Sequence, residues 1–77
     1  MRVKYNFMYR TQVNSSNIKS IGYDAHVAVL EVEFTSGDTY QYFNVPEYLH
    51  QQFLKASSHD QFLDENIKYN YRYQKVS

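Results

Sequence analysis

Hydrophobic and polar positions alternate along much of this chain, and a period of two is typical of β-strands. The alternation predicts strands over residues 3–10, 18–23, 27–34 and 39–43, and it returns in a short tail over 69–73. In the third of these strands, the face expected in the core is formed by Ala28, Leu30, Val32 and Phe34, opposite Glu31 and Glu33. The loop at residues 35–39 predicts a hairpin in which Gly37 takes a positive φ.

After the fourth strand the period changes from 2 to 3.6, which predicts a helix over residues 45–56. Its apolar stripe consists of Val45, Tyr48, Leu49, Gln52, Phe53 and Ala56. Asn44 is the expected N-cap, and Pro46 suits the first turn. A second, shorter helix is expected after Ser58, which forms a capping-box pattern with Gln61.

These elements predict an α+β fold: a small antiparallel sheet of three to five strands with two short helices packed at one side. A chain of 77 residues leaves room for a single domain, residues 1–77, and its nine tyrosines and five phenylalanines supply most of the area that can be buried. The absence of cysteine excludes a disulfide, a thiolate zinc site and a cysteine nucleophile. With no long apolar run and no leader pattern, we expect a cytoplasmic protein with no membrane contact.

The net charge is zero, but the charges are segregated along the sequence. Residues 1–23 carry four basic residues and no acid, residues 24–65 carry all eight acids and one base, and residues 66–77 carry three bases and no acid. If the two ends meet in space, they would build a basic surface that attracts phosphate. The other interpretation is that both ends pair with the acidic middle.

The residues that could support catalysis or metal binding lack the required arrangement. His26, His50 and His59 show no metal-ligand spacing, so we expect neither a metal nor another cofactor. The run from Ser57 to Asp60 contains a serine, a histidine and an acid, but side chains adjacent in sequence diverge, and helix capping explains them better. We therefore expect no catalytic residues and no enzyme activity, with a hydrolase as the remote alternative.

Two groups of aromatic residues are candidates for binding. Tyr40 and Tyr42 point to one side of a strand about 7 Å apart, where they could stack nucleobases or could belong to the core. At the chain ends, tyrosines alternate with cations, an arrangement that offers stacking and phosphate neutralisation. There we expect Arg10 and Arg72 to be exposed and to clamp a phosphate while Tyr71 stacks; an edge ladder between the two ends, or a homo-oligomer seam, is the alternative.

Residues 13–73 resemble the KTSC domain, a module found at the C-terminus of some lysyl-tRNA synthetases and alone in small bacterial and phage proteins. The resemblance is carried by Val13, Ser15–Ile18, Ile21–Asp24, Leu30–Phe34, Gly37, Tyr40–Tyr42, Val45–Pro46, Phe53–Leu54, Ala56–His59, Ile67 and Tyr71–Tyr73. Residues 1–12 would then be an N-terminal strand extension. Where the family usually has glycine, this chain has Asp60, whose carboxylate would weaken a phosphate site at that helix N-terminus.

The resemblance suggests RNA binding through its synthetase context and attaches no catalysis to the module. We expect a non-catalytic module that captures a phosphate-bearing aromatic ligand, either RNA or a nucleotide-type molecule. The alternative is a phage-type accessory protein that sequesters a nucleotide defence signal or binds and inhibits a host protein. The expected ligand-binding residues are Arg10, Tyr23, Tyr40, Tyr42, Ser58, His59, Tyr71 and Arg72.

Overall fold

The computed structural model describes residues 9–77, so most of the strand expected over residues 3–10 lies outside the described part. The strands are β1 (Tyr9–Gln12), β2 (Ile18–Asp24), β3 (Val29–Phe34), β4 (Thr39–Tyr42) and β5 (Tyr73–Lys75). The helices are α1 (Glu47–Lys55), α2 (His59–Phe62) and η2 (Leu63–Ile67). None of the helices formed by residues 9–77 has the length and apolar character needed to cross a bilayer.

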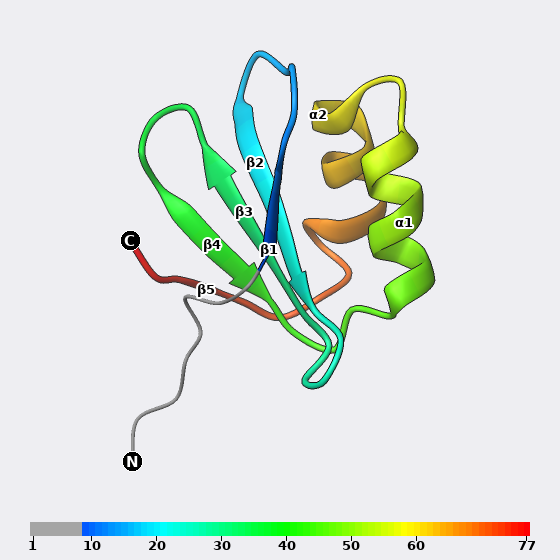
Figure 1. The fold of residues 1–77 in the computed structure, drawn as a ribbon. Helices are drawn as coiled ribbons and strands as arrows, with labels where there is room; N and C mark the ends of the chain where they lie inside the picture. The colour runs from blue at the N-terminus through cyan, green and yellow to red at the C-terminus, as the bar shows by residue number, and fades with distance from the viewer. Residues whose placement is uncertain (1–8) are drawn as a thin grey trace.

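The five strands form one antiparallel sheet in the order β1-β2-β3-β4-β5, and the helices gather on one side of it (Figure 1). The expected α+β class, with its small antiparallel sheet and two short helices at one side, is confirmed. One expectation about the ends is wrong. Strands β1 and β5 occupy opposite edges of the sheet, so these two aromatic, basic segments do not pair with each other in the described part of the chain.

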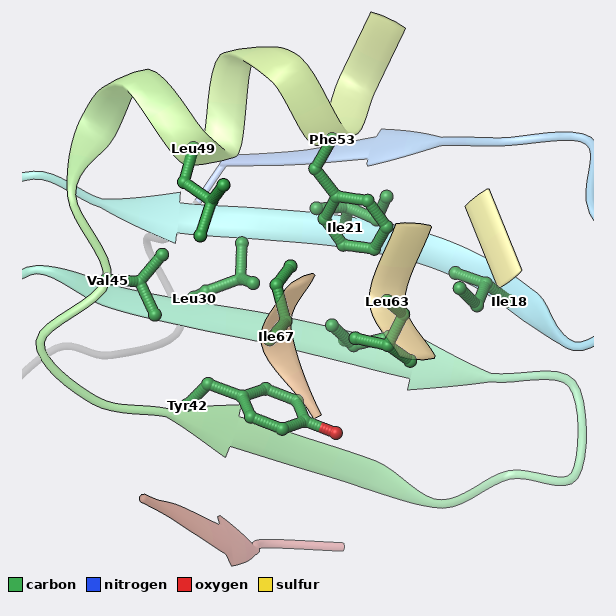
Figure 2. Close-up of a cluster of buried hydrophobic side chains, with 10 residues drawn as sticks. Ile18, Ile21, Leu30, Tyr42, Val45, Leu49, Phe53, Leu63 and Ile67 are labelled. Atoms are coloured by element: carbon green, nitrogen blue, oxygen red, sulfur yellow. The ribbon is translucent and has the colours of Figure 1, made fainter. Parts of the chain in front are cut away.

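The core lies between the sheet and the helices, and Figure 2 shows its side chains converging from both layers. It contains Ile18, Ile21, Leu30, Val32, Tyr42, Val45, Leu49, Phe53, Leu63 and Ile67. Phe53 is the largest side chain among those with no exposed surface, and it connects α1 to the sheet. The expected core face of the third strand is confirmed at Leu30 and Val32, with Phe34 packed against the core, whereas Ala28 precedes β3 with a positive φ of 57°. The helix stripe is confirmed at Val45, Leu49 and Phe53, but Tyr48 and Gln52, expected in the same stripe, are exposed.

A β-bulge explains why Ile18 and Ile21 are both buried although they are three residues apart. In regular alternation, residues three apart point to opposite faces of a sheet. The register shifts between Ile18 and Ser20, because Ile18 pairs with Phe34 and Ser20 pairs with Glu33. The extra residue at Lys19 returns both isoleucines to the helix side.

The two helix starts differ in how well the sequence predicted them. Asn44 is not the N-cap of α1: it takes a left-handed conformation with φ 62°, and Pro46 occupies the N-cap position with no side-chain bond. Ser58 does cap α2, because its hydroxyl accepts a hydrogen bond from the Gln61 backbone N–H at 3.2 Å. The Gln61 side chain bonds to Glu65 instead of returning to the cap, so only half of the capping box forms.

The second helix continues beyond α2 as one wide turn, η2, in which Lys68 N–H donates to the carbonyl of Leu63, five residues earlier, at 2.8 Å. The chain then turns, and regular pairing resumes only at β5. Tyr69 therefore precedes the strand and does not belong to it, although the alternation predicted one strand from residue 69. The turn brings Tyr73 beside β4, where it pairs with Tyr42.

The sheet face away from the helices is polar. One cross-strand row runs through Arg10, Gly22, Glu31, Gln41 and Gln74, one residue from each strand. Gly22 carries no side chain, so the Arg10 guanidinium crosses over β2 to the carboxylate of Glu31. Gln41 bonds to the same carboxylate from the other side at 2.8 Å.

Candidate ligand-binding site

A cleft lies between the α2–η2 helical segment and the strands at the β5 edge of the sheet. It has a volume of about 560 Å³. Its lining consists of Asn17, Phe34, Thr35, Ser36, Asp38, Tyr40, Tyr42, Asp60, Leu63, Asp64, Lys68, Tyr69 and Tyr73. We call this space the aromatic cleft, because four tyrosines and one phenylalanine form much of its wall.

Tyr40, Tyr42 and Tyr73 form a triangle of rings on the sheet side of the aromatic cleft. The ring centroids of Tyr40 and Tyr42 are 6.5 Å apart, and the Tyr73 ring lies 5.6 Å from Tyr40 and 5.9 Å from Tyr42. Phe34 meets Tyr40 edge-on at 5.7 Å. Such packing fixes the rings, and a preformed aromatic surface can stack a flat group at a low cost in side-chain entropy.

The two strand tyrosines have different parts in this triangle. Tyr42 is buried, and its burial raises the pKa of the hydroxyl to about 12, with smaller contributions from Tyr40, Tyr73 and Asp64. Its hydroxyl therefore stays protonated at neutral pH. Tyr40 is only partly buried, whereas Tyr73 is 59% exposed. From the sequence, both stacking and core packing were possible for Tyr40 and Tyr42. In the structure, Tyr42 belongs to the core and Tyr40 to the partly open wall of the aromatic cleft.

The helical segment supplies charges along the other wall of the aromatic cleft. Asp60, Asp64 and Lys68 follow each other at intervals of four residues, close to one turn each, and all three line the cleft. The row covers about two helical turns, roughly 10–11 Å from Asp60 to Lys68. Asp60 accepts a hydrogen bond from the Ser16 hydroxyl at 3.1 Å, and Lys68 lies 5.4 Å from the centre of the Tyr69 ring.

A third carboxylate, Asp38, lines the cleft from the β3–β4 hairpin and forms an ion pair with Lys75 at 3.5 Å. Gly37 beside it takes a φ of 102°, as the hairpin prediction required. The hairpin thus brings in an acid that is already neutralised. Asp60 and Asp64 have no cationic partner within ion-pair distance among residues 9–77.

Tyr71 and Arg72, expected to bind ligand, lie just outside the aromatic cleft. They line a shallow depression together with Tyr69, Asn70 and Tyr73. Arg72 is exposed, and its carbonyl accepts a hydrogen bond from the Phe43 N–H at 2.9 Å. These two residues share Tyr69 and Tyr73 with the main cleft, so the depression adjoins it.

Arg10 lies at the edge of the sheet opposite β5, and the expectation that its guanidinium is exposed is wrong; that it clamps a phosphate stays a prediction. Its guanidinium pairs with Glu31 and also with Glu33 at 3.1 Å, and about one third of the side chain is exposed. Ser20 accepts a further bond from it at 3.3 Å. Because two carboxylates already occupy the guanidinium, Arg10 has a structural role in the helix-free face.

The remaining expected residues, Tyr23, Ser58 and His59, do not line the aromatic cleft. The Tyr23 hydroxyl donates to the carbonyl of Val45 at 2.5 Å, and its ring stacks on His50. Ser58 caps α2, and the His59 ring nitrogen lies 3.3 Å from the Leu54 carbonyl. Ser58 thus caps the second helix, as the capping interpretation predicted, whereas His59 contacts a carbonyl of α1.

Sequence reasoning missed the residues that complete the aromatic cleft, above all Asp64 and Lys68. The four-residue spacing from Asp60 was a usable signal, because it places all three on one side of a helix. Tyr69 and Tyr73 were noted only as terminal tyrosines. Their place opposite the helical segment depends on the turn before β5, which the alternating pattern did not reveal.

The aromatic cleft offers several kinds of group that can contact a ligand. Among residues 9–77, no three histidine or acidic side chains gather where they could hold a metal ion. The cleft offers ring faces for stacking, carboxylates that accept hydrogen bonds and one ammonium group from Lys68 that donates them.

Comparisons with known proteins place the chain in a family. The family model of the KTSC domain matches residues 14–71 of this chain. A crystal structure of a KTSC domain protein from Yersinia pestis superposes with a TM-score of 0.88 at 44% identity, over 91% of this chain and 99% of that one. A protein of Stutzerimonas stutzeri is 39% identical over 90% of this chain and 99% of its own length.

The chain is also similar to a small part of larger enzymes. A lysine–tRNA ligase of Trichormus variabilis is 34% identical over 80% of this chain, which corresponds to 11% of that enzyme. A lysine–tRNA ligase of Nostoc punctiforme is 32% identical over the same shares.

Proposed function

This chain belongs to the KTSC domain family, and from that premise we propose that it is a non-catalytic binding module whose aromatic cleft captures a phosphate-bearing aromatic ligand of the nucleotide type. The observation that carries the proposal is the triangle of Tyr40, Tyr42 and Tyr73, which faces a cleft of about 560 Å³. A cleft of this size lies in the range of small-molecule sites.

The open ring faces account for the aromatic part of the ligand. Tyr73 and Tyr69 are 59% and 82% exposed, which is unusual for tyrosines in a domain that needs its aromatic area for the core. Stacking of a base on an aromatic side chain contributes about 1–3 kcal/mol. A nucleobase between these two rings would cover surface that the fold leaves open.

The charges account for the polar parts of the ligand. Lys68 forms no ion pair with any residue from 9 to 77, and its ammonium is free to donate to a phosphate oxygen. Asp60 and Asp64 accept hydrogen bonds, and ribose hydroxyls or exocyclic amines of a base are suitable donors. The row from Asp60 to Lys68 covers about two helical turns, roughly 10–11 Å, enough for a nucleoside and one phosphate.

RNA is a second candidate, and the lysine–tRNA ligases among the relatives favour it, since those enzymes are named for a tRNA substrate. The exposed cation Arg72 adjoins the aromatic cleft and would extend a contact along a strand. RNA held through several phosphates should lose affinity steeply with added salt, whereas a single enclosed nucleotide should not.

Calorimetric titration with adenosine monophosphate, and separately with a short single-stranded oligoadenylate, tests the proposal. We expect the wild-type protein to bind at least one of them with one site per chain. Tyr69→Leu and Tyr73→Leu should each weaken binding about five-fold or more, because they remove a stacking face worth about 1–3 kcal/mol.

Tyr48→Leu is the matched control. Tyr48 is a tyrosine that is 64% exposed on α1, and it does not line the aromatic cleft. Its replacement should leave the affinity unchanged. Equal losses in all three variants, or no binding of either probe by the folded wild-type protein, would contradict the proposed function.

A further inference from the structure

The charges that line the aromatic cleft point to a ligand of low charge. We infer that the cleft selects a nucleoside joined through a phosphodiester, which carries one negative charge, over nucleotides with terminal phosphate groups. This inference rests on the proposed function and adds to it the chemical class of the ligand.

The lining contains more acid than base. Asp38, Asp60 and Asp64 contribute three carboxylates, and Lys68 contributes the single ammonium. Lys75, from outside the lining, neutralises Asp38 at 3.5 Å. Within the described part of the chain, the lining is then left with two carboxylates without an ion-pair partner, Asp60 and Asp64, and one cation, Lys68.

This imbalance limits the number of phosphate charges that the aromatic cleft can hold. Asp64 and Lys68 lie about one helical turn apart, roughly 5–6 Å along the axis, so a phosphate placed at Lys68 lies within one Debye length of Asp64. The first negative charge on the ligand is balanced by Lys68. A further negative charge at this end must share that one ammonium, because no second cation lines the cleft among residues 9–77, and it is repelled by both Asp64 and Asp60.

Phosphodiesters and terminal phosphate groups differ in their negative charge. A phosphodiester carries one negative charge, whereas a terminal monophosphate carries about −1.5 to −2 at neutral pH, and each added phosphate increases the total. Asp64 is therefore the residue that sets the preference. Asp64 also acts on the opposite wall of the cleft, where, after burial, Tyr40 and Tyr73, it helps to raise the pKa of the Tyr42 hydroxyl.

The test compares ligands that share the adenosine group and differ in charge: 3′,5′-cyclic AMP, the linear dinucleotide ApA, AMP and ATP. Titrations at constant low salt without divalent cations should give the tightest binding to a phosphodiester and weaker binding to AMP. ATP should bind more weakly still, with a loss of up to about three-fold for each added charge, the repulsion expected for unit charges about 6 Å apart in water. Cyclic AMP and ApA carry the same single charge, so their comparison distinguishes a compact ligand from a linear one.

Asp64→Asn tests the assigned residue, because it keeps the shape of the side chain and removes its charge. It should reduce the preference for a phosphodiester over ATP about three-fold or more. Glu65→Gln is the matched control: Glu65 is the next residue along the same helical segment, outside the lining, and its carboxylate bonds to Gln61. It should leave the preference unchanged, and thermal melting of both variants verifies that they fold.

The possible results separate this inference from the proposed function. If ATP binds as tightly as the phosphodiesters, or if Asp64→Asn leaves the ratio unchanged while Tyr69→Leu still weakens binding, the charge selection is wrong and the nucleotide site stands. If none of the four ligands binds and the oligoadenylate also fails, the proposed function itself is overturned.

Discussion

Arg10 and Glu31 form an ion pair across Gly22, although they belong to strands that are not neighbours in the sheet. Two strand spacings amount to roughly 9–10 Å, a distance that a long guanidinium side chain covers only if nothing projects from the strand between. Glu31 is one-tenth exposed and also accepts a bond from Gln41. Together with Gln41, the pair therefore links β1, β3 and β4 on the sheet face that carries no helix.

Replacing Arg10 with alanine should destabilise the fold. The change leaves the buried carboxylate of Glu31 without its cation, and we expect the free energy of unfolding to fall by about 1–3 kcal/mol. Urea unfolding measures this loss. Arg72→Ala is the control, because it removes an exposed arginine and should change stability by less than about 0.5 kcal/mol.

The same pair can be examined with a double change. Glu31→Gln in the Arg10→Ala background removes the unpaired charge and should restore part of the lost stability. If Arg10→Ala unfolds at the same urea concentration as the wild-type protein, the ion pair contributes nothing to the fold.

Ser58→Ala should weaken the start of the second helix. The hydroxyl satisfies the Gln61 N–H, and loss of such a cap costs about 0.5–2 kcal/mol. Ser57→Ala is the control, since Ser57 is the exposed neighbour and its hydroxyl has no hydrogen-bond partner among residues 9–77. Equal melting temperatures for the two variants would show that the cap is not a stabilising contact.

Acidification should destabilise the protein through His50. Burial lowers the pKa of His50 below its usual value of 6.5, while Glu47 partly opposes the shift, and the buried Nδ1 has no hydrogen-bond partner. The unfolded chain then binds a proton more readily than the native state. This contribution to stability is present above pH 6.5 and is lost as the pH falls through the lower native pKa.

Urea unfolding at a series of pH values between 7.5 and 5 would measure the effect; both limits are about one unit or more from the ordinary histidine pKa. His50→Gln should remove this part of the pH dependence, and His26→Gln should keep it, since the His26 side chain is 97% exposed. A His50→Gln protein with the slope of the wild type would assign the dependence to other groups.

Local patterns in the sequence were sufficient for most of the fold. Alternation located the central strands because one face of each is buried and the other is polar, as at Leu30 and Glu31. Ser58 was identified as a cap because its effect acts within three residues. Asn44 failed as a cap because the chain turns at it in a left-handed conformation before the helix begins at Glu47.

The features that could not be predicted depend on contacts between distant segments. The bulge at Lys19 is defined by pairing with β3, and the alternation of β2 alone does not specify it. The neutralisation of Arg10 requires the order of three strands. The aromatic cleft requires Tyr73 to meet Tyr40, 33 residues earlier by their numbering, and only the β4–β5 pairing brings them together.

That last pairing has a consequence for how the aromatic cleft responds to a ligand. Strand β5 has three residues, all exposed, and lies at the edge of the sheet. Short edge segments with few buried contacts open at a lower free energy than the core, so β5 is a unit of local unfolding that carries Tyr73 with it. A ligand stacked on Tyr73 would bind only the closed form, and occupancy of the cleft would therefore be reported by slower amide hydrogen exchange at Val76, whose N–H bonds to the Thr39 carbonyl at 2.8 Å.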